Sequence, residues 1–316
     1  MQPTVQTLPF RSLSPQQVVL ARPSHTVPDM LSAVEEKLLM AVYRFHYLTL
    51  EQIVCYLGIS PNSANWIRKK LKSLVDRAFL DTQFLPRLTP YGRLPLIYML
   101  GTEGVNHFKE LGYPVSYHSP KERIRGYLFL THTLDLNDLL IAAASLSRSN
   151  PAITLTEWKH ERVLKHMPCK VDIGNGKTSA VVPDAWLDWQ LETPFGAPGE
   201  DRFSTFVEVD RDTEDITQFK PKVRSYLAFA NGAYKVFGSE VFNVVFVVAD
   251  GGQRRLHQLR KWTMEQVTTQ EAVDFSIFFK FALLPAAPID AVSLFLSPVW
   301  YTLEDDRPVS LIEKIL

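Results

Sequence analysis

Residues 58–75 read GISPNSANWIRKKLKSLV, and this stretch decides the N-terminal fold. Gly58 ends one helix, and Ser60 can cap the next, with Pro61 in the first helical position, where its missing N–H costs nothing. Apolar residues then recur at three- and four-residue steps, the period of an amphipathic helix. Two helices joined by so short a turn predict a helix-turn-helix.

The neighbouring sequence extends this prediction to a winged helix. Asp29 and Thr49 can cap two preceding helices. Strand-like runs at 79–85 and 94–100 follow the third helix, and a fourth helix begins at 101–104. Three helices, a hairpin and a further helix are the element order of a winged helix-turn-helix.

The outer face of the third helix is polar and basic. Side chains near its start are expected to reach base edges of double-stranded DNA, and the later cations and the hairpin turn are expected to lie near phosphates. The candidate DNA-binding residues are Asn62, Ser63, Asn65, Arg68, Lys69, Lys70, Lys72, Arg87 and Arg93. Such cations can also simply solubilise one face of a helical domain, and winged helices also bind proteins.

Charge is unevenly distributed along the 316 residues. The chain carries 34 Lys/Arg and 34 Asp/Glu, but the first 118 residues hold 12 basic and 8 acidic side chains. This asymmetry indicates that, if the protein binds nucleic acid, it does so through the N-terminal third.

The distant Cys55 and Cys169 exclude a disulfide scaffold or a cysteine-rich zinc site. With no apolar run of about 18 residues and no signal peptide, we expect a cytoplasmic protein without a membrane partner.

The rest of the chain predicts a mixed sheet covered by helices. Strands are expected at 153–164, 179–191, 203–210, 242–249 and 274–284, and helices at 121–147, 214–229 and 254–266. Pro221 is expected to break or begin the regular part of its helix. The predicted division is a flexible leader at 1–28, a winged-helix domain at 29–118, an α/β domain at 119–284 and a C-terminal extension at 285–316, which either packs back or contacts a partner.

Three acidic residues fall at strand ends. Glu208 and Asp210 alternate on one strand, so period-two geometry places both on one face, and Asp184 lies on a neighbouring strand. Carboxylate oxygens are the ligands that Mg²⁺ and Mn²⁺ prefer, and Lys222 or Lys220 could stabilise charge on a phosphate. The alternative is that these acids cap helices or pair with nearby basic residues.

A larger pattern resembles the replication-relaxation family over 34–249. The residues that carry the resemblance are His132, Asn137-Asp138, Pro183-Asp184-Ala185, Glu208-Val209-Asp210-Arg211-Asp212-Thr213-Glu214, Lys222 and Tyr226. The resemblance implies a role in plasmid or mobile-element replication, relaxation or mobilisation.

The second domain also looks like the PD-(D/E)xK, or restriction-endonuclease-like, fold, which implies Asp184 and Glu208 as its acids. That pattern expects lysine where this chain has Asp210, so Lys222 or Lys220 would have to substitute for it. Asp138 is the best candidate for the acid supplied by the preceding helix. His132 is expected to be a buried histidine bonded to the sheet.

Two function classes follow from these patterns. In the first, the protein is a DNA endonuclease or nickase in which Asp184, Glu208 and Asp210 hold Mg²⁺ or Mn²⁺ and Lys222 stabilises the transition state. In the second, it is a non-catalytic replication accessory factor or transcriptional regulator with a degenerate nuclease-like domain. Other replication or mobilisation proteins are further candidate partners, and a homodimer that reads paired half-sites is an open alternative.

Overall fold

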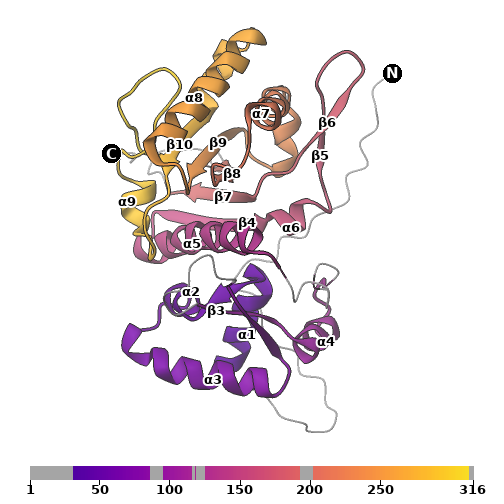
Figure 1. Cartoon of the computed structure of the whole chain (residues 1–316), viewed down its shortest axis with the longest axis vertical. Coiled ribbons are helices and arrows are strands. Elements are labelled where there is room, and N and C mark those ends of the chain that lie inside the picture. The colour runs from indigo at the N-terminus through magenta and orange to yellow at the C-terminus, as the bar shows by residue number, and fades with distance from the viewer. Residues whose placement is uncertain (1–30, 86–94, 116–117, 119–124, 193–201, 313–316) are drawn as a thin grey trace. The chain divides into compact units, whose positions relative to one another are not determined.

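The computed structural model describes residues 31–85, 95–115, 118, 125–192 and 202–312 (Figure 1). Helices dominate its N-terminal part, and a mixed five-stranded sheet with helices on both faces forms the rest. The chain is therefore an α+β protein, as the sequence predicts. None of the described helices is long and apolar enough to cross a bilayer.

Two capped helices open the described chain. α1, Ala33–Phe45, begins after Ser32, whose hydroxyl accepts the Glu35 N–H while the Glu35 carboxylate accepts the Ser32 N–H. α2, Leu50–Tyr56, begins after Thr49 with the same reciprocal arrangement. Each capping box satisfies two backbone donors that the helix itself leaves unpaired. The predicted cap at Thr49 is confirmed.

The third helix starts with a 3₁₀ turn, Pro61–Ser63, and continues as α3, Ala64–Asp76. Ser60 stands at the predicted N-cap position, but its hydroxyl makes no capping hydrogen bond to a described residue. Proline opens the helix because its fixed φ suits the first turn and its missing N–H needs no partner. The buried residues of α3 follow the predicted spacing and are Ile67, Leu71 and Leu74.

A small antiparallel sheet packs with these helices, in the order β1-β3-β2. Its strands are β1, Leu48–Thr49, β2, Leu80–Phe84, and β3, Leu96–Leu100. The sequence predicts β2 and β3 but not the two-residue β1. Gly101 precedes α4, Thr102–Glu110, and a Cβ at Gly101 would lie 2.2 Å from the Ala78 carbonyl oxygen, so only glycine fits there.

Several predictions fall on parts of the chain outside the described residues. These are the leader at 1–28, the cap at Asp29, and the hairpin arginines Arg87 and Arg93. The predicted domain boundaries remain predictions.

The main sheet has the order β10-β9-β8-β7-β4. Its strands are β4, Ile153–His160, β7, Ala185–Leu191, β8, Arg202–Asp210, β9, Val241–Val248, and β10, Phe279–Leu283. β7 runs antiparallel to both of its neighbours, whereas β8, β9 and β10 are parallel. The sheet therefore changes from antiparallel to parallel pairing at β8.

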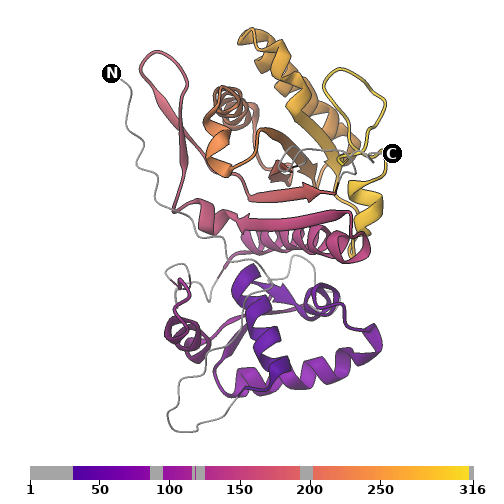
Figure 2. The same ribbon diagram turned by 180° about the vertical axis from the view of Figure 1, so that it is seen from behind.

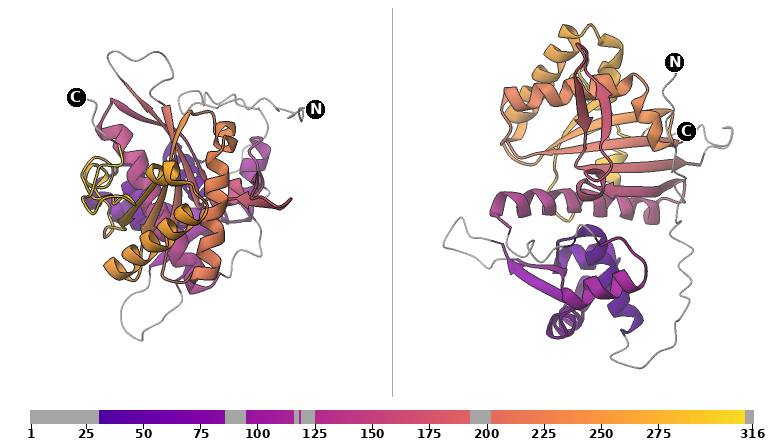
Figure 3. Two further views of the ribbon diagram at one scale, coloured as in Figure 1. Left: turned by 90° about the horizontal axis from the view of Figure 1, so that it is seen from above. Right: turned by 90° about the vertical axis from the view of Figure 1, so that its right-hand side faces the viewer.

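Helices cover both faces of this sheet (Figures 1 and 2). α5, Tyr127–Ser149, lies on one face, and α7, Ile216–Ala230, and α8, Gly252–Thr269, lie on the other (Figure 3). Successive side chains of β9 point to opposite faces of the sheet. Val245 packs in the core on the side of α5, and Phe246 packs in the core on the side of α7 and α8. Burial on both faces explains the continuous apolar run of this strand.

The predicted strand at 179–191 is two strands in different sheets. β6, Thr178–Val181, ends before Pro183, which cannot donate to a ladder, and β7 begins after it. β6 pairs with β5, Cys169–Asp172, which the sequence does not predict. The two form a hairpin that extends away from the main sheet past α7 (Figures 1 and 2).

Three other element predictions need correction. α7 begins five residues before Pro221, where the Asp215 carboxylate caps the N–H groups of Thr217 and Gln218, and it continues through the proline. β4 ends at His160, and the short helix α6, Glu161–Leu164, follows it. The predicted strand at 274–284 is a 3₁₀ turn up to residue 278 and only then β10.

The C-terminal extension packs back on the described chain. It contains α9, Ala291–Phe295, and the fully buried Trp300, whose indole N–H donates to the Leu294 carbonyl at 2.6 Å. Tyr301 pairs with Phe281 of β10 and so covers that edge of the sheet. Of the two predicted alternatives, packing back is the one observed.

α5 is hydrogen-bonded to the N-terminal helices through its own side chains. Asn137 is completely buried, and its amide donates to the carbonyls of Phe45 at 3.2 Å and Tyr47 at 2.6 Å, where α1 gives way to β1. At the next residue, the Asp138 carboxylate accepts from the Gln52 amide at 2.9 Å. Asp138, the candidate helix acid, is thus bound to α2.

Replacing Asn137 with alanine removes both of its hydrogen bonds and leaves two buried carbonyls without that partner. We expect the free energy of unfolding to fall by about 1–3 kcal/mol, the cost of one buried group left unsatisfied, because the Phe45 carbonyl still accepts the Tyr47 N–H. Urea unfolding of the full chain measures this change. Gln218→Ala, on the exposed face of α7, is the control and should change the value by less than about 0.5 kcal/mol. Equal effects of the two variants would contradict the role given to Asn137.

Candidate functional site

Four polar side chains from separate segments meet where β7 begins beside β8. Asp184 immediately precedes β7, Glu208 lies near the end of β8, and Lys222 comes from α7. His132 reaches Asp184 from α5, on the other face of the sheet. The predicted proximity of Asp184 and Glu208 follows from the antiparallel pairing of β7 with β8.

The Asp184 carboxylate accepts a backbone N–H of β8 at the point where the pairing of β7 with β8 has ended. Its Oδ2 accepts the Val209 N–H at 2.8 Å, just beyond the last β7–β8 pair, and lies 3.1 Å from Nε2 of His132. Burial raises the pKa of Asp184, but His132, Lys222 and the Val209 N–H outweigh burial and hold this pKa below its usual value. Asp184 is therefore ionised at neutral pH.

His132 is the cationic partner of Asp184. Burial lowers the pKa of His132, but the hydrogen bond and charge of Asp184, with Glu161 and Glu208, raise it to about 9. The imidazole therefore keeps its proton at neutral pH and forms an ion pair with Asp184.

Glu208 is buried and has two donors. Its Oε2 accepts from Nζ of Lys222 at 2.9 Å, and its Oε1 accepts from the Tyr226 hydroxyl at 2.5 Å. Burial raises the pKa of Glu208 to about 7; Lys222 opposes this shift, and the charge of Asp184 adds to it. Burial also lowers the pKa of Lys222, but Glu208, Asp184 and Glu214 outweigh burial and raise it above its usual value, so the ammonium stays charged.

Asp210 lies on the same face of β8 as Glu208 but has a different partner. Its two oxygens accept from Nε and Nη2 of Arg255, each at 2.8 Å, and Arg255 of α8 is only 2% exposed. Two parallel charge-assisted bonds of this kind hold a carboxylate firmly. The structure thus brings Asp184 and Glu208 together and directs Asp210 to α8.

Lys220, the other candidate cation, also lies apart from the acidic pair. Its ammonium forms an ion pair with Glu265 of α8 at 2.9 Å. Of the two candidate lysines, Lys222 is the one that contacts Glu208.

The donor set fits a divalent cation only through Asp184 and Glu208. Within the described ranges, no group of three His, Cys, Asp or Glu side chains is placed to hold a metal. Mg²⁺, however, commonly binds one or two carboxylates and completes its shell with water and phosphate oxygens. Oδ1 of Asp184 accepts no hydrogen bond from a described residue, whereas a cation at Glu208 would have to displace Lys222 or Tyr226.

A cavity of about 220 Å³ opens beside this pair. Glu208, Lys222 and Tyr226 form one side of it, and residues 179–182 of the β5–β6 hairpin and its exit form the other. The Ser179 and Ser225 hydroxyls, 2.7 Å apart, tie the two sides together. Of the acidic pair, Glu208 therefore borders this cavity, on the side that carries the lysine, whereas Asp184 is not among the lining residues.

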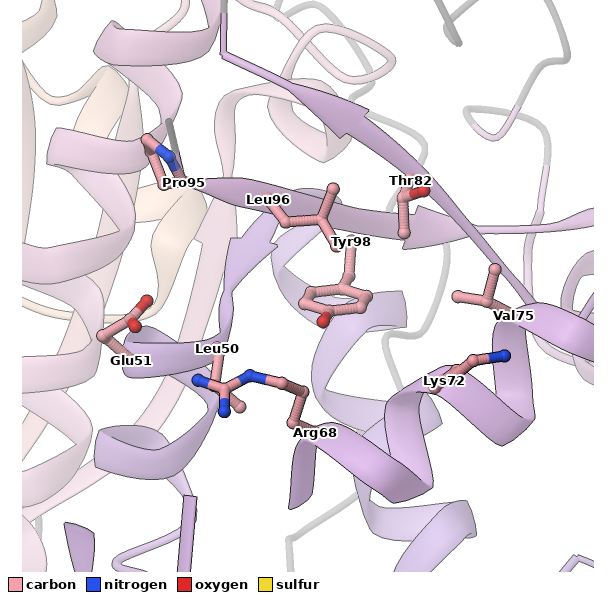
Figure 4. A pocket seen from close by; sticks show the side chains of 9 residues that line it. All are labelled: Leu50, Glu51, Arg68, Lys72, Val75, Thr82, Pro95, Leu96 and Tyr98. Atoms are coloured by element: carbon pink, nitrogen blue, oxygen red, sulfur yellow. The ribbon is translucent and has the colours of Figure 1, made fainter. Parts of the chain in front are cut away.

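A second candidate surface lies on α3. A groove of about 780 Å³ separates α3 from β2 and β3 (Figure 4). Arg68 and Lys72 stand on its helical side, and Thr82 and Tyr98 stand on the strand side. The groove is therefore lined by two exposed cations, a hydroxyl and a phenol, together with the carboxylate of Glu51 from α2.

Most of the predicted DNA-binding residues on and before α3 are exposed, but they differ in whether their charges already have partners. Asn62, Asn65, Arg68, Lys69 and Lys72 are exposed, and Ser63 is half-buried. Lys72 pairs with Asp76 at 2.6 Å in an open i,i+4 pair, and Lys69 makes no ion pair with a described residue. Lys70 instead turns toward α1 and lies 3.6 Å from Glu35, so its charge is partly committed within the fold.

The sequence analysis names His132 and Tyr226 through the family resemblance, but it does not name Arg255, which also shapes the acidic site. His132 was expected to bond the sheet, but its partner is the Asp184 carboxylate. Arg255 gave no signal in the sequence, because its partner lies 45 positions away. Tyr226, named there without a role, stands four positions after Lys222 and hence on the same face of one helix, which already indicates that the two side chains share a partner.

The chain belongs to the replication-relaxation family, whose model matches residues 39–245, about two thirds of the sequence. The match includes α3, the acidic pair and α7. No curated protein and no solved structure matches the chain. Membership supports a role related to replication or mobilisation.

The ion pair between His132 and Asp184 should make stability depend on pH. The folded-state pKa of His132, about 9, lies above the ordinary value of 6.5, so its contribution is complete below pH 6.5 and is lost as the pH rises through 9. We expect the free energy of unfolding to fall by roughly 2–3 kcal/mol across this interval. Urea titrations at pH 6.5, 8 and 9.5 test it, and His132→Gln should flatten the profile. An unchanged profile in that variant would show that another group titrates.

Proposed function

We propose that the protein binds duplex DNA through α3 and cleaves a phosphodiester bond at the Asp184–Glu208 pair. The observation that supports cleavage is the meeting of two carboxylates and a lysine, from three separate segments, beside a cavity. Burying several charges together is costly, and packing alone gives no reason for it. Strongly shifted pKa values in such a recess are typical of functional sites.

The N-terminal part supplies the proposed DNA contact. The order α1-α2-α3 followed by the antiparallel β2 and β3 is what we interpret as a winged helix, with α3 as its recognition helix. The exposed Asn62 and Asn65 would face base edges, and Arg68, Lys69 and Lys72 would face phosphates. The groove beside α3 would take the adjacent sugar-phosphate strand.

The residues of the acidic site have distinct proposed roles. Asp184 and Glu208 would hold a divalent cation, which supplies an activated water and charge neutralisation when bound. Lys222 keeps its proton across the neutral range and would stabilise negative charge that develops on the phosphate oxygens. His132 orients Asp184, and Tyr226 orients Glu208, through the hydrogen bonds described above.

One observation favours a second candidate, a DNA-binding factor without catalysis. Both oxygens of Glu208 already accept hydrogen bonds, and both oxygens of Asp210 bind Arg255. Carboxylates whose oxygens already accept hydrogen bonds from the protein's own side chains do not require a metal ion to compensate their burial. In this alternative the acidic pair has a structural role, and α3 still binds DNA.

A plasmid assay separates the two candidates. Purified protein is incubated with a supercoiled plasmid carrying the DNA that flanks its gene, with Mg²⁺, with Mn²⁺ or with EDTA. We expect metal-dependent conversion to nicked or linear DNA, and a fall of at least about 100-fold in rate for Asp184→Asn and for Lys222→Met, since one electrostatic contact to the reacting group is worth that much.

The matched control is Lys220→Met, which removes a cation of the same helix that pairs with Glu265 instead. It should cleave at nearly the wild-type rate. Binding without cleavage under all metal conditions would support the second candidate.

Charge reversal tests the DNA contact on α3. Arg68→Glu/Lys69→Glu/Lys72→Glu should make the slope of log affinity against log salt shallower by about 2.7, since each phosphate contact contributes about 0.9. Fluorescence anisotropy with labelled duplex, in EDTA, measures it. Lys235→Glu/Lys261→Glu/Arg307→Glu changes the net charge equally at exposed positions elsewhere and should leave the slope nearly unchanged. If both triple variants bind alike, α3 is not the contact.

A further inference from the structure

The β5–β6 hairpin is anchored on one face only. Val171 and Val181 are buried in the core with α7, and Ser179 bonds Ser225 at 2.7 Å. Cys169 lies against the Ala233 carbonyl at 3.8 Å. A two-stranded hairpin is marginal by itself, so these contacts are what fix its direction.

The opposite face and the tip of the hairpin are open to solvent. The exposed residues of this face are Lys170, Asp172, Thr178 and Ala180. The tip turns through Gly174, Asn175 and Gly176, all with positive φ, and ends at the exposed Lys177. Neither Lys170 nor Lys177 forms an ion pair with a described residue, and Asp172 accepts the Gly174 N–H at 2.8 Å.

This hairpin borders the acidic site. Its second strand and exit line the cavity opposite Glu208 and Lys222, and the chain reaches Asp184 three residues after β6 ends. A duplex that brings one phosphate to the mouth of this cavity from the lysine side therefore passes beside the hairpin.

We infer that the β5–β6 hairpin is a second DNA-contacting element, which enters a groove of the duplex next to the bond that is cut. A two-stranded ribbon fits the major groove, which is about 12 Å wide. Lys170 and Lys177 contact phosphates on its two sides, and the Asn175 amide at the tip can donate to and accept from base edges. This inference rests on the proposed function, since it takes the acidic pair as the place where DNA is cut.

The test is a comparison of charge-reversal pairs in the full chain. For Lys170→Glu/Lys177→Glu we expect at least about a tenfold loss of duplex affinity near 0.15 M salt and a salt slope shallower by about 1.8, two contacts at about 0.9 each. Lys261→Glu/Arg307→Glu, on α8 and in the C-terminal segment, changes the charge equally and should bind as wild type. Binding is measured in EDTA, so that it does not depend on cleavage, and thermal unfolding verifies that each variant folds.

The outcomes separate this inference from the proposed function. If the hairpin pair binds like its control while the α3 triple variant loses binding, the hairpin inference is overturned and the proposed function stands. If wild type does not nick DNA but the hairpin pair loses affinity, the hairpin contact stands and the proposed cleavage is overturned. A wild-type chain that binds no duplex DNA overturns both.

Discussion

The buried amide of Asn137 is the constraint on which the rest of the arrangement depends. It donates to two carbonyls at the break between α1 and β1, and it does so from the middle of a helix that also covers the main sheet. The same helix places His132 on Asp184 and Asp138 on Gln52. α5 therefore sets the position of the first helices and of the acidic site at once.

Charge around the acidic site is balanced locally rather than by solvent. Lys222 lies between Glu208 and Glu214, Arg255 holds Asp210, and His132 holds Asp184. The attraction within each pair offsets part of the free energy that desolvating its charges costs, and removing one member would leave the other charge uncompensated. This explains why the segment 208–214, so rich in acids, can end a central strand.

Much of the fold could be predicted from local patterns, because caps and periodicity act over three or four residues. Thr49 and the spacing of Ile67, Leu71 and Leu74 are examples. The approach of Asp184 to Glu208 was also predictable, since neighbouring strands bring their ends together. The partners of Lys70 and Asp210 were not, because Glu35 and Arg255 come from distant helices whose packing no local pattern encodes. β6 overlaps the predicted strand at 179–191, but β5 could not be predicted, because a four-residue run after Pro168 is too short to give a strand signal.

The order of the main sheet bears on how the chain is built. From β4 to β10, apart from the β5–β6 hairpin, each strand pairs with the strand synthesised just before it. During translation the sheet can therefore grow at one edge, strand by strand, without waiting for a later segment to be inserted between earlier ones. β10 then receives Tyr301 along its outer edge, so that this edge is covered against pairing with another chain.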